Sequence, residues 1–206
     1  MKKLHILSLV ILLCSVTEAQ LIRGYGLKIG GTVANQVWDN STGINLDPEN
    51  KLGFNIGAFA EFLDVPFFSV VGEINYVRKT NKDELSVTTV DNPEGTGEIR
   101  DYETGASFLN ISLLGKLRTN LVLLSPYIIA GPKIDITLDK INDFDMPDSF
   151  NSELIGMKAG IGTEINLVAV TLLAEFIYDF NFNPLYDSDF LEIKTSSFDF
   201  RIGVYF

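Results

Sequence analysis

Apolar and polar residues alternate along most of this 206-residue chain. In the segment 25–33, for example, Leu27 and Ile29 lie on either side of Lys28. Alternation of this kind is typical of a β-strand whose two faces meet different surroundings, because successive side chains point to opposite sides. The same pattern recurs in segments 25–33, 52–62, 68–76, 109–118, 128–136, 155–165, 170–179 and 197–206. The sequence therefore predicts an all-β domain of eight strands.

The connections between these segments are alternately short and long. The short ones span 63–67, 119–124 and 167–169, and the long ones span 36–51, 80–105, 139–152 and 181–193. The long connections are polar and rich in Asp, Asn and Gly. Short turns at one end and long loops at the other are typical of small outer-membrane barrels. We therefore expect an eight-stranded antiparallel transmembrane β-barrel, with its strands joined as an up-and-down meander.

The composition of the polar faces indicates which side of the strands meets lipid. A soluble barrel of the lipocalin kind turns its apolar face inward, whereas a membrane barrel turns it outward. The polar faces carry Lys28, Lys116, Arg118, Lys133, Lys158 and Arg201 together with Glu61, Glu73, Asp135, Glu164, Glu175, Asp179 and Asp199. Opposite charges can pair inside a lumen, whereas each would cost roughly 2–4 kcal/mol facing lipid at mid-bilayer. The sequence favours the membrane arrangement, in which Leu27, Ile56 and Ile161 face lipid.

Small and apolar residues also occur on the predicted inward face. The inward glycines are Gly26, Gly30, Gly53, Gly57, Gly160, Gly162 and Gly203, and the inward apolar residues are Phe59, Val71, Leu114, Ile129, Leu173 and Ile177. The glycines would leave room for long charged side chains, because an eight-stranded barrel is only wide enough for side chains. The apolar residues have two interpretations: packing within the filled lumen, or a small apolar pocket that binds a ligand.

The N-terminal segment has the order of an export signal. Lys2 and Lys3 precede an apolar stretch from Leu4 to Leu13, and Thr17 and Ala19 are small residues at the positions that a signal peptidase reads. We expect residues 1–19 to be a signal peptide and residues 20–206 to be the barrel domain, located in the cell outer membrane.

Removal of this segment limits the chemistry of the mature chain. His5 and Cys14 are the only histidine and the only cysteine, so the mature chain would have neither. Loss of Lys2, Lys3 and Glu18 changes the formal charge from −11 to −12 (−11 − 2 + 1). We therefore expect no enzyme, no catalytic, cofactor-binding or metal-ligating residues, and no nucleic acid partner.

One acidic segment leaves cation binding open. Asp139, Asp143, Asp145 and Asp148 lie close together in a predicted loop. Carboxylates can bind Ca²⁺, but their spacing does not match the twelve-residue calcium loop, which also needs a glycine and a final glutamate. We interpret the segment as a solvated loop.

Three further segments carry a family resemblance. They are Pro126–Pro132, Ala159–Gly162, and the C-terminal alternation of Phe198, Phe200, Ile202, Val204 and Phe206. With these segments the chain resembles the PorT-like, OmpA-like family of outer-membrane β-barrel proteins. The resemblance implies an eight-stranded barrel without catalytic residues, whose C-terminal strand is similar to the signal read by the outer-membrane assembly machinery.

Two functions follow from the sequence and the resemblance. The first is a non-enzymatic barrel with a filled lumen and long acidic external loops, which serves envelope structure or binds a protein partner. A role in secretion is open, because one family member has it. The second is a barrel, soluble or embedded in the membrane, that binds a small apolar ligand. The expected partners are outer-membrane lipid, the assembly machinery and a protein at the external loops.

Overall fold

The computed structural model describes residues 22–40, 49–86, 99–119, 121, 123–142, 150–167, 170–188 and 191–206. These residues form ten strands: β1 (Ile22–Asn40), β2 (Glu49–Asn50), β3 (Leu52–Val65), β4 (Phe68–Ser86), β5 (Ile99–Arg118), β6 (Leu124–Asn142), β7 (Glu153–Asn166), β8 (Thr171–Asn181), β9 (Tyr186–Asp187) and β10 (Leu191–Tyr205). Within the described part of the chain, no helix is long and apolar enough to cross a membrane.

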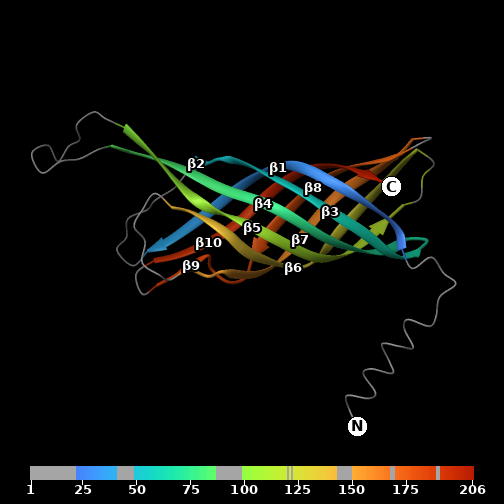
Figure 1. Ribbon diagram of the computed structural model, residues 1–206. Coiled ribbons are helices and arrows are strands. Elements are labelled where there is room, and N and C mark those ends of the chain that lie inside the picture. Colours follow the sequence, from blue (N-terminus) through green and yellow to red (C-terminus); the bar gives the residue numbers. More distant parts are fainter. Residues whose placement is uncertain are drawn as a thin grey trace, which may run out of the picture.

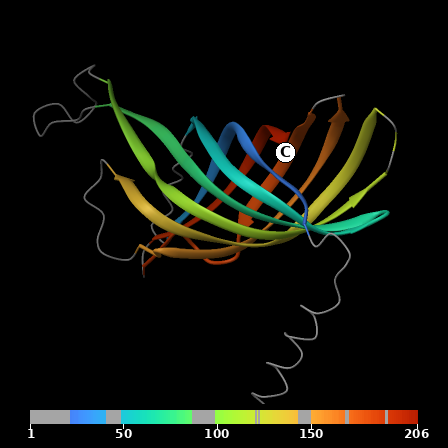
Figure 2. The same ribbon diagram turned by 45° about the vertical axis from the view of Figure 1, so that its right-hand side comes forward.

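The eight long strands close into a barrel. Each pairs antiparallel with the next in the order β1, β3, β4, β5, β6, β7, β8, β10, and β10 pairs back onto β1. The closing register runs from Gly26↔Tyr205 to Asn40↔Leu191. Figures 1 and 2 show these tilted strands wrapping around a single axis. The predicted eight-stranded up-and-down barrel is confirmed, and the two-residue strands β2 and β9 are additions that pair with β4 and β10.

The two ends of the barrel differ as the connection lengths predict. At the turn end, short connections join β3 to β4, β5 to β6 and β7 to β8, and β10 ends beside the start of β1. Phe206 lies there on the outer surface, with its ring centroid 6.2 Å from that of Tyr25. The strand ends that the long connections join lie at the opposite end, which we call the loop end (Figure 1).

The strands run farther into the predicted loops than the sequence pattern indicates. The segment 80–105 was predicted as a loop, but β4 continues to Ser86 and β5 begins at Ile99, and these stretches pair from Thr80↔Gly105 to Ser86↔Ile99. In Figure 2 this hairpin extends beyond the neighbouring strands. The backbone hydrogen bonds of an antiparallel ladder do not depend on an alternating side-chain pattern. A hairpin that does not cross the bilayer needs no apolar face, so a pattern of alternation does not predict its length.

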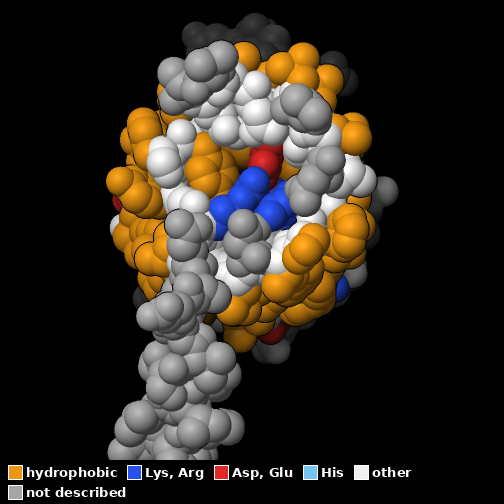
Figure 3. Space-filling model, turned by 90° about the vertical axis from the view of Figure 1, so that its right-hand side faces the viewer, with side chains coloured by type: hydrophobic (Ala, Val, Ile, Leu, Met, Phe, Trp, Pro, Cys, Tyr) orange, Lys and Arg blue, Asp and Glu red, His pale blue; other side chains and the backbone are white. Residues whose placement is uncertain are grey.

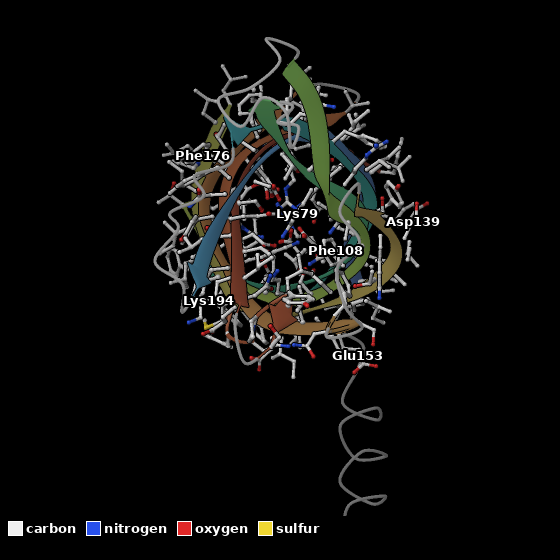
Figure 4. All side chains as sticks on the ribbon, turned by 90° about the vertical axis from the view of Figure 1, so that its left-hand side faces the viewer. Lys79, Phe108, Asp139, Glu153, Phe176 and Lys194 are labelled. Carbon is white, nitrogen blue, oxygen red and sulfur yellow. The ribbon has the colours of Figure 1, made fainter. Side chains whose placement is uncertain are left out.

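The side chains alternate between the two surfaces as predicted. All thirteen charged residues expected in the lumen are buried. The apolar residues between them lie outside, with exposed fractions of 59% for Leu27, 50% for Ile56 and 61% for Ile161. Figure 4 likewise places Phe176 outside the ring of strands. The outer surface is therefore apolar and the interior is ionic.

Inward glycines leave room for specific neighbours. A Cβ atom on Gly30 would lie 2.2 Å from the backbone oxygen of Phe200 and 3.0 Å from Cγ of Arg201. One on Gly203 would lie 2.9 Å from the backbone oxygen of Leu27 and 3.0 Å from Cγ of Lys28. A Cβ atom on Gly162 would lie only 2.5 Å from Cζ of Tyr127. These contacts support the prediction that small residues on one strand accommodate long side chains from another.

The crowding at Gly162 gives a stability prediction. Gly162→Ala should destabilise the protein by about 1–3 kcal/mol, because the Tyr127 ring is buried and cannot move without strain. Gly72→Ala is the matched control, since its added Cβ would meet Cε2 of Phe62 at 3.5 Å, an ordinary contact. We expect the control to change stability by less than about 1 kcal/mol. Denaturant unfolding in lipid vesicles would measure both variants, and equal shifts would contradict the packing described here.

Candidate functional site in the barrel lumen

An ionic network fills the lumen at the turn end. Glu61, which is fully buried, accepts hydrogen bonds from Arg23 (2.7 Å), Arg118 (2.6 Å), Lys116 (2.9 Å) and the hydroxyl of Tyr205 (2.6 Å). Glu164 accepts two bonds from the Arg23 guanidinium, at 2.8 and 2.9 Å, and one from Lys116. We call these six residues the turn-end cluster. Figure 3 shows Lys and Arg side chains at the bottom of the hollow at this end.

Arg23 enters the turn-end cluster because of a local irregularity. The pairing of β1 with β3 shifts between Ile22 and Gly24, so Arg23 departs from the alternation that the rest of β1 follows. A β-bulge of this kind re-aims a side chain. Its side chain is 24% exposed, and its guanidinium carbon lies 5.4 Å from the ring centroid of Tyr205.

An apolar layer separates the turn-end cluster from the ionic groups deeper in the lumen. Phe59, Val71, Leu114, Tyr127, Ile129, Leu173 and Ile177 form one buried cluster, and Tyr205 packs against it. We call this set the apolar belt. It draws residues from β3, β4, β5, β6 and β8. The six apolar residues predicted to face inward all belong to it, so they pack on one another and fill the lumen at this level.

Beyond the belt, a central cluster is built around two glutamates. Lys28 donates to Glu73 (2.6 Å) and to Glu175 (2.8 Å), and Arg201 bridges the same two carboxylates at 2.9 and 2.6 Å. The hydroxyl of Tyr127 donates to Glu175 at 2.7 Å, which ties the belt to this cluster. Lys158 adds a further cation 3.5 Å from Glu73. These carboxylates therefore have structural partners.

A second set of ion pairs continues toward the loop end. Asp179 accepts from Lys79 at 2.9 Å and from Lys133 at 2.5 Å, and Lys133 also donates to Asp135 at 2.5 Å. Asn110 donates to Asp135 and accepts from Lys158, which joins this set to the central cluster. Beyond the belt the described lumen thus holds five cations (Lys28, Lys79, Lys133, Lys158, Arg201) and five carboxylates (Glu73, Asp135, Glu175, Asp179, Asp199). Its formal charge is zero.

A smaller apolar cluster lies near the loop end. Ala106, Phe108, Leu154 and Leu185 are buried together, with Phe150 packed against them. Figure 4 places Phe108 and Lys79 inside the ring of strands. Leu185 belongs to the connection between β8 and β9, whose backbone is held by hydrogen bonds from Asn151 N to Leu185 O (2.9 Å) and from Leu185 N to Ile193 O (2.7 Å). A segment between strands thus helps to fill the lumen at this end.

The sequence pattern did not predict two of the cationic side chains in the lumen, and it left Ca²⁺ binding by four aspartates open. Arg23 lies at the bulge, and Lys79 lies beyond the end of the predicted third strand, although it shares the alternation of Glu73 and Asn75. Of the four aspartates considered for Ca²⁺, Asp139 is exposed on β6, and Asp143, Asp145 and Asp148 lie outside the described residues. No group of three or more His, Cys, Asp or Glu residues suited to a metal ion occurs among the described residues.

A closed antiparallel barrel with an apolar outer surface and a paired ionic interior is a transmembrane β-barrel. The chain belongs to the outer membrane protein beta-barrel domain family, whose model matches residues 19–187, well over half of its 206 residues. The protein is therefore an outer-membrane protein, as predicted. None of the curated protein sequences matches this chain.

Two solved structures support the fold. Neisserial surface protein A is 15% identical, with a TM-score of 0.52 over 90% of this chain and 99% of that one. The outer membrane protein OprG from Pseudomonas aeruginosa is 11% identical, with a TM-score of 0.51 over 90% and 97% of the two chains. At such low identity these similarities concern the barrel architecture alone.

Proposed function

We propose that this protein is a non-enzymatic outer-membrane barrel that does not conduct ions and acts through its loop end. The observation that carries the proposal is the filling of the lumen. The apolar belt and the apolar cluster at Phe108 lie on either side of ionic groups whose formal charges sum to zero. Eight strands enclose a lumen only wide enough for side chains. The surfaces that remain for a partner are the external connections and the hairpin of β4 and β5.

The absence of an enzymatic role is inferred from residue types. Histidine is the most common general acid or base, and the only histidine, His5, lies in the predicted signal peptide. The buried pair Glu175 and Asp179, which share one strand face, are both held by cations from other strands. We also propose that the assembly machinery recognises β10, which ends beside the exposed Phe206. A role in secretion would be one specific form of the partner binding proposed for the loop end.

Conductance measurements test the closed lumen. The purified protein, inserted into planar lipid bilayers, should give no stepwise ion current above that of the bare bilayer. A large porin inserted in the same way controls for the assay, and heat-modifiable migration on gels controls for folding. Reproducible current steps from the folded protein would contradict the proposal.

A shortened hairpin tests the role of the loop end. Ser86 and Ile99 are paired, so an Asn-Gly turn in place of residues 87–98 should close the hairpin there. The variant should fold and insert normally, because the barrel pairing is unchanged. Capture from detergent-solubilised membranes should recover a partner with the intact chain and lose it with the variant. Capture of the same proteins by both would show that this hairpin does not bind them.

A further inference from the structure

Four buried polar atoms on one side of the lumen lack a hydrogen-bond partner among the described protein atoms. They are Oδ1 of Asn55, Oγ of Ser197, Oδ1 of Asp199 and Nε of Arg201. The exposed fractions of these residues are 2% or less. Buried polar atoms are almost always hydrogen-bonded, and a buried polar atom without a partner destabilises the folded state. Four such atoms in one region therefore require an explanation.

The strand register places these atoms close together. On β10, Asp199 and Ser197 pair with Thr32 and Ala34 of β1. On the other side of β1, Thr32 accepts a hydrogen bond of 3.0 Å from Nδ2 of Asn55. Side chains on paired strands lie about 4.5–5.5 Å apart at Cβ. The unpartnered atoms therefore lie on two strands, β3 and β10, which flank β1, and Asn55 and Asp199 are both neighbours of Thr32.

The residues of β1 that face them are short. Thr32 and Ala34 are both buried, and Gly53 pairs with Thr32 on β3. Long side chains such as Lys79, Lys133 and Lys158 come from other strands of the barrel. The stretch of β1 from Thr32 to Ala34, between the long buried side chains of Lys28 and Gln36, therefore contributes little side-chain volume beside the unpartnered atoms.

The hydrogen-bonding capacity of the four atoms indicates which kind of molecule or ion could satisfy them. Water can donate to the oxygens of Asn55 and Asp199 and accept from Nε of Arg201, whereas a bare ion can do only one of these. The charged groups that act on Asp199 are Asp179, Lys79, Lys158 and Arg201. These cations oppose a metal ion, and the two aspartates oppose an anion. Exchanging the oxygen and nitrogen of the Asn55 amide would still leave one polar atom for a water molecule to satisfy.

We propose that the lumen contains an internal hydration site, in which ordered water molecules bridge Asn55, Ser197, Asp199 and Arg201. A buried water molecule typically makes two to four hydrogen bonds to groups that would otherwise be unsatisfied. Asn55 bonds Thr32, the register partner of Asp199, and Ser197 and Arg201 are the inward residues of β10 on either side of Asp199. More than one water molecule is therefore needed to connect all four side chains. The site lies on the loop-end side of the apolar belt, within the neutral ionic part of the lumen.

A crystal structure that resolves ordered water tests the proposal directly. We expect solvent density within about 3.2 Å of both Asp199 Oδ1 and Ser197 Oγ. Three results would overturn the site: no density there, Nζ of Lys79 or Lys158 rotated onto Asp199, or an ion with short contacts of about 2.4 Å to several oxygens.

NMR of the folded protein in detergent gives a second test. Magnetisation should pass from long-lived water to the backbone amides of Ser197 and Asp199. Ser197→Val removes a hydroxyl and adds a methyl group at the site, so it should abolish the transfer to Asp199. Ser125→Val is the matched control, because Ser125 is equally a buried serine but lies at the turn end, where it bonds Leu121 O. Transfer that is absent in the parent protein, or unchanged in Ser197→Val, would contradict the proposal.

Discussion

Replacement of Glu73 by glutamine is expected to destabilise the folded protein by about 3–5 kcal/mol. Glu73 is buried between Lys28, which bonds it at 2.6 Å, and Arg201, which bonds it at 2.9 Å. Lys158 lies 3.5 Å away. Glutamine keeps the size of the side chain but removes its charge. The neutral central region would then hold a net positive charge away from bulk water.

Glu192→Gln is the matched control for this change. Glu192 pairs with Lys194 at 2.8 Å, but their side chains are 36% and 56% exposed. Exposed ion pairs contribute roughly 0–1 kcal/mol. Denaturant unfolding of both variants in lipid vesicles would measure the difference in the free energy of unfolding. A Glu73→Gln variant no less stable than Glu192→Gln would show that the buried cluster does not depend on this carboxylate.

Replacement of Ile161 by arginine should impair membrane insertion by roughly 2–4 kcal/mol if the site lies near mid-bilayer. Ile161 is an outward residue of β7, and its register partners Ile128 and Phe176 are also outward and exposed. Arginine at this position would bring a charge into the hydrocarbon region. The expected result is a smaller fraction of folded, inserted protein and a lower free energy of unfolding.

Thr119→Arg provides the comparison for Ile161→Arg. Thr119 is exposed and lies just after β5 at the turn end, where a charge reaches water. We expect this variant to insert as well as the parent protein. The folded fraction in vesicles, measured by heat-modifiable migration, would report both. Equal insertion of the two variants would mean that Ile161 does not face lipid.

Alternation along the chain was sufficient to predict the strands, their sidedness and the charged residues of the lumen. A shift of one residue would exchange the two faces of a strand. The burial of Lys28 and the exposure of its neighbour Leu27 therefore confirm the predicted sidedness of β1. The inward position of Phe59 and Leu114 was also predicted, but the sequence left an apolar pocket open beside the favoured interpretation, packing within the lumen, until their contacts were known. The periodicity of a sequence indicates which way a side chain points, but not which residues it contacts.

The features that the sequence did not reveal depend on backbone irregularity or on closure of the barrel. Arg23 faces inward through a bulge that breaks the alternation, and Lys79 lies on a stretch of β4 that extends past the apolar pattern. The partners of Glu175 are equally hidden, because Lys28 lies 147 positions away and approaches only when β10 pairs with β1. Such pairs cannot be assigned from composition or spacing.

The central claim is that the apolar face of the barrel meets lipid, and site-directed spin labelling tests it most directly. The mature chain is expected to lack cysteine, so single cysteines can be placed at Leu27, Ile56 and Ile161, with Lys194, which is exposed near the loop end, as reference. In lipid vesicles, labels at the first three sites should collide mainly with oxygen, and the label at 194 mainly with a water-soluble nickel complex. Labels at 27, 56 and 161 that are shielded from oxygen would contradict the account, because the apolar side chains would then line the interior.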